Sequence, residues 1–301
     1  MADGETWFFR RADPVAIGGR TLVMAIVNLT PDSFSGAGAP APTPDEACAI
    51  ALSHLENGAD IIDFGAESTR PGSKPLTARE EATRLGDVVR LTRRRTGAPI
   101  SIDTYHVETA EMALDQGADI VNDVTALKGV FSPGADGGSG MAELAARARA
   151  HVALAHAPAD PLTMADAPAY RDVAADVAAF LIARADAAVR AGVDERRIWL
   201  DPGFGFGKRF EDNCALLVRQ ETVAKLGYPV LAGLSRKRMI ADALGLPVDE
   251  RFEASVALAV MAALNGARIV RVHDVKATVR AIRMVDAVRN AACSAVYSGS
   301  S

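Results

Sequence analysis

The sequence predicts a (β/α)8 TIM barrel preceded by a short N-terminal hairpin or arm. Short apolar runs repeatedly end in a polar or charged residue, and each is followed by a stretch with helical periodicity. Three junctions are also nearly identical, with the sequences NGADIIDFGA, QGADIVNDVT and NGARIVRVHD. Buried parallel strands read as continuous apolar runs. Eight such units in 301 residues favour a barrel over a doubly wound open sheet, which is the alternative.

Strands and helices are expected to alternate after residues 7–20, where Gly18-Gly19 is a turn signal for the hairpin. Apolar runs predict strands near 22–29, 60–65, 99–104, 119–124, 151–156, 197–202, 228–234 and 267–273. The stretches between them predict helices near 45–57, 78–95, 107–116, 141–150, 171–191, 211–225, 237–265 and 275–292. The seventh of these is long enough for two helices, broken near Gly245 and Pro247.

Local composition supports the boundaries of these elements. In the repeated junctions, a glycine stands where a left-handed helix C-cap is expected, at Gly58, Gly117 and Gly266. Residues 36–44 and 128–140 are rich in Gly and Pro or Ser, which predicts mobile, exposed loops. No linker separates the units, so a single domain over residues 1–301, with a core at about 15–290, is expected.

Composition excludes several classes of protein. The chain is 49% hydrophobic, which is ample for one large core, and its net charge of −5 without a basic stripe argues against a nucleic-acid partner. Its three cysteines are far apart, so neither a zinc site nor a disulfide framework is expected. No apolar run approaches the ~20 residues of a membrane span. A cytoplasmic protein without a membrane partner is therefore expected.

The ends of the predicted strands locate a candidate site, because the carboxyl ends of parallel strands converge. Asp103, Asn122 and Asp201 suit the edge of a planar heterocycle that displays N–H donors, since a carboxylate can bind such an edge with both oxygens. The alternative for each residue is a helix N-cap. Asn28, which ends the first strand, could bind a hard cation or a ligand, or could simply form a turn.

Other residues predict an anionic ligand. Thr69 and Arg70 in DFGAESTRPGS suit a phosphate or carboxylate, although an ordinary polar loop is the alternative. Ser235 and Lys237 precede a helix in the region where such barrels bind anions. Arg271 lies in an apolar strand and needs an anionic partner, which could also be a structural Asp or Glu.

Two further stretches at strand ends carry weaker signals. Phe206 in the glycine-rich LDPGFGFGKRF could stack on a ring, although the spacing there is not that of a P-loop. A lone histidine, His156, is expected to be structural.

The stretches MAIVNLTPDSFS, DFGAESTRPGS, SIDT, NDV, LDPGFGFGK, GLSRK and RVHDV occur in this order between residues 15 and 290. Together they resemble the dihydropteroate synthase family of pterin-binding enzymes. The resemblance implies a (β/α)8 barrel, a homodimer, and a transferase of folate biosynthesis that is a target of sulfonamides. It implies condensation of 6-hydroxymethyl-7,8-dihydropterin diphosphate with 4-aminobenzoate by an SN1-like displacement that releases pyrophosphate.

The resemblance also implies roles for individual residues. Those that would hold the pterin are Asp103, Asn122, Asp201 and Lys237, supported by Asp63. Those at the diphosphate would be Asn28, Thr69, Arg271 and His273, with Asn28 as the protein ligand of a Mg²⁺ cofactor. Those beside the aminobenzoate would be Arg70, Pro71, Phe206 and Ser235, and Val272 is expected to contact substrate as well. Asp103, Asp201, Lys237, Arg271 and His273 are expected to be catalytic.

The chain departs from the family pattern at two positions. Ala66 stands where the family usually has Gly, and Ala155 stands where it usually has a pterin-contacting Met. The alternatives are a methyltetrahydrofolate–corrinoid methyltransferase, which would not need the anion-binding residues, and a non-catalytic pterin-binding subunit. Asp201→Asn is expected to abolish activity, and Arg184→Ala, on an expected outer helix, is expected to be a neutral control.

Overall fold

The computed structural model describes residues 5–30, 41–67, 75–129, 140–158 and 170–298, with side chains up to residue 292. Eight parallel strands close into a barrel in chain order, so the predicted (β/α)8 fold is confirmed. They are β3 (Leu22–Asn28), β4 (Ile61–Gly65), β5 (Ile100–Asp103), β6 (Ile120–Asp123), β7 (His151–Ala155), β8 (Ile198–Asp201), β9 (Val230–Ala232) and β10 (Ala267–Val272). Each lies within two residues of its predicted bounds.

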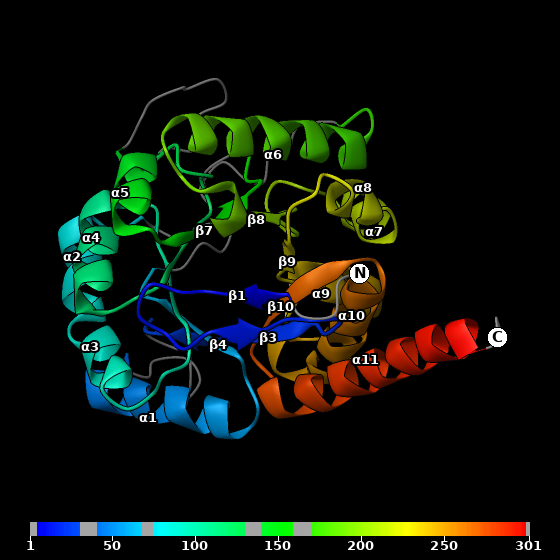
Figure 1. Ribbon diagram of the computed structural model, residues 1–301, viewed down its shortest axis with the longest axis horizontal. Coiled ribbons are helices and arrows are strands. Elements are labelled where there is room, and N and C mark those ends of the chain that lie inside the picture. The colour runs from blue at the N-terminus through cyan, green and yellow to red at the C-terminus, as the bar shows by residue number, and fades with distance from the viewer. Residues whose placement is uncertain (1–4, 31–40, 68–74, 130–139, 159–169, 299–301) are drawn as a thin grey trace.

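Helices form a ring around the strands (Figure 1). They are α1 (Pro44–Glu56), α2 (Ala78–Leu85), α3 (Val88–Arg93), α4 (Val107–Gln116), α5 (Met141–Ala148), α6 (Val173–Arg190), α7 (Phe210–Val218), α8 (Glu221–Ala224), α9 (Arg238–Leu244), α10 (Phe252–Leu264) and α11 (Val275–Ser298), with short 3₁₀ turns at Glu195–Arg197 and Val248–Glu250. No helix in the described part of the chain is both long and apolar enough to cross a membrane.

Helix ends follow local chemistry. Thr43 and Glu46 form a capping box at the start of α1, which satisfies amide groups that have no partner within the helix. The three repeated glycines adopt positive φ, as expected, with values of +96° at Gly58, +116° at Gly117 and +97° at Gly266. The single helix predicted over 78–95 is wrong, because Gly86, at φ +52°, ends α2 before α3 begins. The single helix predicted over 211–225 is wrong as well, because the structure has two helices there, α7 and α8.

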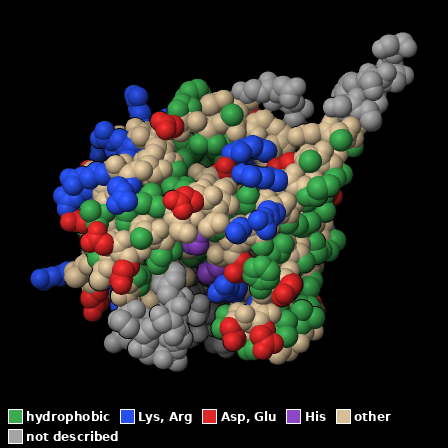
Figure 2. Space-filling view, turned by 90° about the horizontal axis from the view of Figure 1, so that it is seen from below, with side chains coloured by type: hydrophobic (Ala, Val, Ile, Leu, Met, Phe, Trp, Pro, Cys, Tyr) green, Lys and Arg blue, Asp and Glu red, His purple; other side chains and the backbone are tan. Residues whose placement is uncertain are grey.

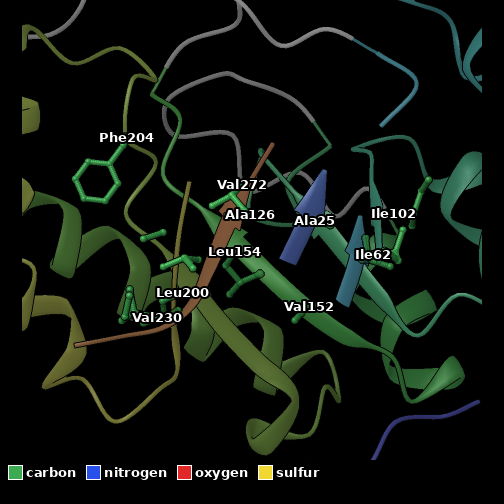
Figure 3. Close-up of a cluster of buried hydrophobic side chains, with 14 of the residues drawn as sticks. Ala25, Ile62, Ile102, Ala126, Val152, Leu154, Leu200, Phe204, Val230 and Val272 are labelled. Carbon is green, nitrogen blue, oxygen red and sulfur yellow. The ribbon is translucent and has the colours of Figure 1, made fainter. Parts of the chain in front are cut away.

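Alternate strand residues build two separate cores. Inside the barrel, Leu22, Met24 and Trp199 pack with other inward-facing side chains. Their neighbours Val23 and Leu200 belong to the larger core between strands and helices, part of which is shown in Figure 3. This alternation follows from the two-residue period of a strand. On each strand, the residue two positions after an inner-core residue also faces into the barrel, so the inner apolar core lies directly beneath the side chains at the carboxyl ends of the strands.

A small antiparallel hairpin closes the N-terminal end of the barrel. Its strands are β1 (Thr6–Trp7) and β2 (Val15–Ala16), and β1 crosses in front of the barrel in Figure 1. Trp7 packs on Trp199 with ring centroids 5.0 Å apart. Gly18 and Gly19 do form a turn, closed by the N–H of Arg20, which donates to the carbonyl of Ile17 at 3.0 Å, but this turn is not the reversal of the hairpin, which lies between Trp7 and Val15. Gly18, at φ +48°, instead lies in the connection from the hairpin to β3.

Candidate active site

Polar side chains form a layer at the carboxyl ends of the barrel strands. Each stands two residues beyond an inward-facing apolar residue, so the strand period turns it into the barrel: Asp63 after Ile61, Asn122 after Ile120, Asp201 after Trp199 and Arg271 after Ile269. Strand register then sets their height, because Asn28, Gly65, Asp103 and Asn122 are paired in succession across β3 to β6. The structure thus brings together the predicted strand-end residues.

Arg271 is the centre of an ion-pair network in this layer. Its Nε donates to Asp63 Oδ2 at 2.6 Å, and its Nη2 donates to Asp103 Oδ2 at 2.7 Å. Asn122 Nδ2 lies 3.5 Å from the same oxygen of Asp63. The anionic partner that Arg271 was predicted to need is therefore provided by two carboxylates of the site itself. Asp63 is fully buried, which makes it a support for the network.

Burial shifts the protonation of the site carboxylates. Desolvation raises the pKa of Asp103 to about 7, against the opposing charge of Arg271. Desolvation also raises the pKa of Asp201, which accepts the backbone N–H of Gly203 at 2.7 Å. Burial acts against the charge of Arg271, but attraction from Asp63 and Asp103 outweighs it, so the pKa of Arg271 is raised. The layer therefore combines a fixed cation with carboxyl groups that can change charge.

Ser235 and His273 form a second pair at the same end of the barrel. Ser235 Oγ accepts the backbone N–H of His273 at 3.2 Å and lies 3.0 Å from its Nδ1. Ser235 precedes α9, which begins at Arg238 with Lys237 as its N-cap residue. Although the two residues were assigned to different substrates, they are in direct contact. A ligand that reaches one of them would therefore come close to the other.

Only one of the three consecutive cations at the start of α9 faces the other site residues. Lys237 Nζ lies 4.1 Å from the centroid of the Phe206 ring, a cation–π contact that also places Phe206 at the site. Arg236 is held instead by Asp274, at 2.7 Å, and Arg238 forms an exposed pair with Asp242. The three consecutive cations are therefore divided between the site and the scaffold.

Some expected site residues are placed elsewhere or lie outside the described residues. Val272 packs in the core between strands and helices (Figure 3), because it lies one residue from inward-facing Arg271. The expectation that Val272 contacts substrate is therefore not supported by the direction of its side chain.

Three other expected site residues, Thr69, Arg70 and Pro71, lie outside the described residues, as do most of the two expected mobile loops. Ala155 faces the barrel beside Asp201, with which it is in register. Ala66 is buried.

Arg184 is not the neutral control that the sequence predicted. Its Nε donates to the backbone carbonyl of Ala126 at 2.9 Å. Ala126 and Leu127 both adopt positive φ, of 53° and 63°, in the turn that follows β6. A substitution of Arg184 would therefore disturb a strained turn next to the site.

The sequence prediction missed Lys208 and its contact with His156. Lys208 is buried, and its Nζ lies 2.9 Å from His156 Nδ1. His156 was expected to be structural, and it does pack edge-on against Phe180. The available signal was a lysine directly after three alternating glycines, since the carbonyls of a glycine-rich loop suit a central cation.

Asn28 is the described residue best placed to hold a divalent cation. It ends β3, and Gly65 lies between Asn28 and Asp103 on the neighbouring strand. A Cβ added at Gly65 would stand 3.7 Å from Asn28 Oδ1 and 3.6 Å from Asp103 Cβ, so the absence of a side chain at Gly65 leaves space beside the amide oxygen of Asn28. Among the described residues, no cluster of three acidic, histidine or cysteine side chains could hold a metal ion. A single amide oxygen beside a site for anions fits Mg²⁺, which commonly keeps several waters and shares substrate phosphates.

Comparison with known proteins connects this arrangement to a family. A family model described as pterin binding enzyme matches residues 24–273. The dihydropteroate synthase of Bacillus subtilis strain 168 is 40% identical over 271 residues, covering 90% of each chain.

Two solved structures of Xanthomonas albilineans dihydropteroate synthase are similar over nearly the whole fold. The structure with 4-aminobenzoic acid is 42% identical, with a TM-score of 0.82 over 92% of this chain and 95% of that one. The structure in complex with 7,8-dihydropteroate is 40% identical, with a TM-score of 0.77 over 90% and 94% of the two chains.

Proposed function

Because the chain belongs to the dihydropteroate synthase family of pterin-binding enzymes, we propose that it joins 4-aminobenzoate to 6-hydroxymethyl-7,8-dihydropterin diphosphate. The products are 7,8-dihydropteroate and pyrophosphate. The observation that carries the proposal is the polar layer at the barrel mouth, where Asp103, Asn122 and Asp201 stand beside Arg271. This layer suits one ligand that has both a flat donor edge and an anionic group.

The pterin ring would bind to the carboxylate side of the layer. Its amino group and ring N–H are donors, and Asp201 can accept them while it keeps its bond from Gly203 N. Asn122 can both donate and accept, and Lys237 over Phe206 offers a cation near the ring. Asp103 is held by Arg271, which orients its carboxylate before the substrate arrives.

The diphosphate would bind to the cationic side of the layer. Arg271 has five N–H donors, and its contacts with Asp63 and Asp103 use Nε and Nη2, which leaves Nη1 for a phosphate oxygen. His273, held by Ser235, adds a second donor. We assign Thr69 to the same group and Arg70 and Pro71 to the aminobenzoate, from the resemblance to the family.

Asn28 would hold Mg²⁺ together with diphosphate oxygens and waters. The ion, when bound, would neutralise part of the charge that develops on the departing diphosphate. Removal of divalent cations with a chelator should therefore abolish turnover, and added Mg²⁺ should restore it. Turnover that is indifferent to the chelator would contradict this role.

The residues of the chain favour a dissociative displacement. The electron-rich dihydropterin can stabilise positive charge at its methylene carbon, and the ionised carboxylates of Asp103 and Asp201 would stabilise that charge further. Arg271 and His273 would stabilise the leaving diphosphate. The amine of aminobenzoate then attacks the methylene carbon and loses a proton, for which no strong base is needed. Water is the competing nucleophile, so it would have to be excluded from the site for the amine to react.

We further propose that the chain acts as a cytoplasmic homodimer. Exposed apolar side chains gather on α10 and α11, including Met261 and Leu264 on the first and Met284 and Val288 on the second. Figure 2 shows hydrophobic side chains along the flank that α11 forms. Exposed apolar side chains on two helices that pack together favour association with a second copy.

The decisive experiment measures pyrophosphate release and dihydropteroate formation when the protein is mixed with both substrates. Both products should form together, and only when both substrates are present. A methyltetrahydrofolate–corrinoid methyltransferase would give neither product. A non-catalytic pterin-binding subunit would bind the pterin diphosphate in calorimetry without releasing pyrophosphate. Either of these results would overturn the proposal.

A further inference from the structure

Lys208 is a buried ammonium surrounded by neutral acceptors. Its residue is only 8% exposed. Its Nζ lies 2.9 Å from His156 Nδ1 and donates to the carbonyl oxygens of Gly203, His156 and Phe206, at 2.8, 3.1 and 3.2 Å. An ammonium group has three donors, so these four acceptors use all of them. The loop that joins β8 to α7 is therefore folded around this one cation.

The same loop is fixed at several other points. Gly203 adopts φ +69°, and a Cβ there would stand 2.1 Å from the carbonyl oxygen of His156, so only glycine allows the approach. Asn213 accepts the N–H of Gly205 at 2.7 Å and donates to the carbonyl of Lys208 at 3.1 Å. Asp201 accepts the N–H of Gly203 at 2.7 Å. The loop thus has a defined shape, with Lys208 at its centre.

This shape sets the position of side chains at the substrate site. Phe206, whose carbonyl accepts from Lys208, lies beneath the ammonium of Lys237 at 4.1 Å from the ring centroid. A Cβ at Gly205 would stand 3.0 Å from Lys237 Cδ, so the loop backbone also limits where Lys237 can lie. Asp201 begins the loop and is bonded to it. Movement of the loop would therefore displace three side chains of the site together.

We propose that Lys208 is a positioning residue for the reaction, because its ammonium holds the loop that places Phe206 and Lys237 against the substrates. This inference rests on the proposed function. Stability alone does not explain a lysine here, since burying a cation costs free energy that an apolar side chain of similar length would not. What the cation adds is a single anchor for three carbonyls of a loop that lines the site.

The test compares Lys208→Met, which keeps the stem and removes the cation, with Lys208→Gln, which keeps a donor. Lys225→Met is the matched control, because the side chain of Lys225 is 72% exposed. Lys208→Met should raise the KM for 4-aminobenzoate and the Kd for the pterin substrate about tenfold, the loss of roughly one charge-assisted hydrogen bond. The kcat at saturation should change less than about threefold. Lys208→Gln should lie between Lys208→Met and the unmodified protein, and the control should change nothing.

A folded Lys208→Met protein with unchanged KM and Kd would overturn the inference. Because the Kd of the pterin is measured without turnover, it tests Lys208 even if no pyrophosphate is released. Absence of pyrophosphate release by the unmodified protein would instead contradict the proposed function. The two failures are therefore distinguishable.

The pH dependence of the unmodified protein is a second test, which applies even if the variants do not fold. Burial lowers the pKa of Lys208 to about 7. The charged and titratable groups around it are Asp201, Lys237, Asp212 and His156, and burial also lowers the pKa of His156, to about 2, so that it stays neutral. Because deprotonation removes a donor to the loop, the KM for aminobenzoate should rise between pH 6 and pH 9.

The stability contribution of Lys208 should have the opposite sign. Its folded pKa lies below the ordinary 10.5, so between about pH 7 and 10 the unfolded chain binds more protons, and this group makes the folded state more stable as the pH rises. If the KM rises with pH while the Tm does not fall, the rise in KM cannot result from unfolding of the protein. A KM that is constant between pH 6 and 9 would overturn the inference.

Discussion

At the scale of single residues, Asp103 and Asp201 occupy equivalent strand ends but are held differently. Asp103 is bound by the guanidinium of Arg271 at 2.7 Å, whereas Asp201 accepts a backbone N–H at 2.7 Å. Replacement of Asp103 would leave Arg271 with one partner fewer, while replacement of Asp201 leaves the ion-pair network intact. Asp201 is therefore the better position at which to test ligand binding alone.

Asp201→Asn should retain the fold and lose the pterin. The amide oxygen can still accept Gly203 N, so the Tm should stay close to that of the unmodified protein. The amide cannot accept two donors from the pterin edge, and loss of that charged interaction costs on the order of 3 kcal/mol, or about 100-fold in Kd. Calorimetry with the pterin substrate measures this loss.

The matched control is Asp186→Asn, on the exposed face of α6. It makes the same chemical change away from the barrel mouth and should alter neither Kd nor turnover. Full activity of Asp201→Asn would contradict the assignment of Asp201 to the pterin.

The protonation of Asp103 should limit activity at low pH. Burial raises its pKa to about 7, and the ionised form is the one that accepts donors and stabilises positive charge. The value of kcat/KM for the pterin substrate should therefore fall as the pH is lowered from 8 to 5.5. A flat profile measured over this range would contradict this role.

The same shift affects stability with the opposite trend. Because the folded pKa lies above 3.8, the folded protein holds more protons than the unfolded chain between about pH 4 and 7. The contribution of Asp103 to the free energy of unfolding should therefore decline as the pH rises through this window. Denaturant titrations at pH 4.5 and 7.5 measure the free energy of unfolding. In Asp103→Asn, this free energy should lack the decline that Asp103 contributes in the unmodified protein.

At the scale of elements, the N-terminal hairpin stabilises the barrel without contributing to the polar layer. Trp7 is 6% exposed and packs on Trp199, two residues before Asp201 on β8. The hairpin thus supplies apolar side chains to the inner core at the end away from the site. Stability and chemistry are separated along the barrel axis.

Trp7→Ala should lower the free energy of unfolding by about 3 to 5 kcal/mol, because it removes a large buried ring and leaves a cavity. Both KM values should stay within about twofold, since the polar layer is not touched. Urea denaturation and steady-state kinetics measure the two effects. Phe8→Ala is the control, because Phe8 is 63% exposed in the same hairpin. Equal losses of unfolding free energy in the two variants would contradict the inference that the hairpin stabilises the barrel through the inner core.

At the scale of the whole molecule, the apolar flank of α10 and α11 predicts assembly. Size-exclusion chromatography with light scattering should give about twice the mass of the 31.5 kDa chain. Met284 and Val288 lie one turn apart on α11 and are 63% and 55% exposed. Replacement of both by Glu should give a monomer, because charge repels across a two-fold interface. Val189→Glu, on α6, is the control and should remain dimeric.

Much of the fold could be predicted because each strand is short, apolar and bounded by a polar residue. Helix breaks were harder to predict. Gly86 was not recognised as the end of α2, because a glycine within a helical pattern is often tolerated. The hairpin turn was assigned to Gly18-Gly19, but strand pairing of Thr6 with Ala16 puts it earlier. Pairing between strands is a long-range property that local composition does not report.

The sequence by itself determined the eight-unit pattern and the polar residues that end its strands, because the period of a strand and the convergence of parallel strands follow from backbone geometry. Only the tertiary structure decided which of these residues bind one another. It paired Arg271 with Asp63 and Asp103 and placed the ammonium of Lys208 against His156. Such contacts join residues far apart in the chain, so they depend on register and packing rather than on any local signal.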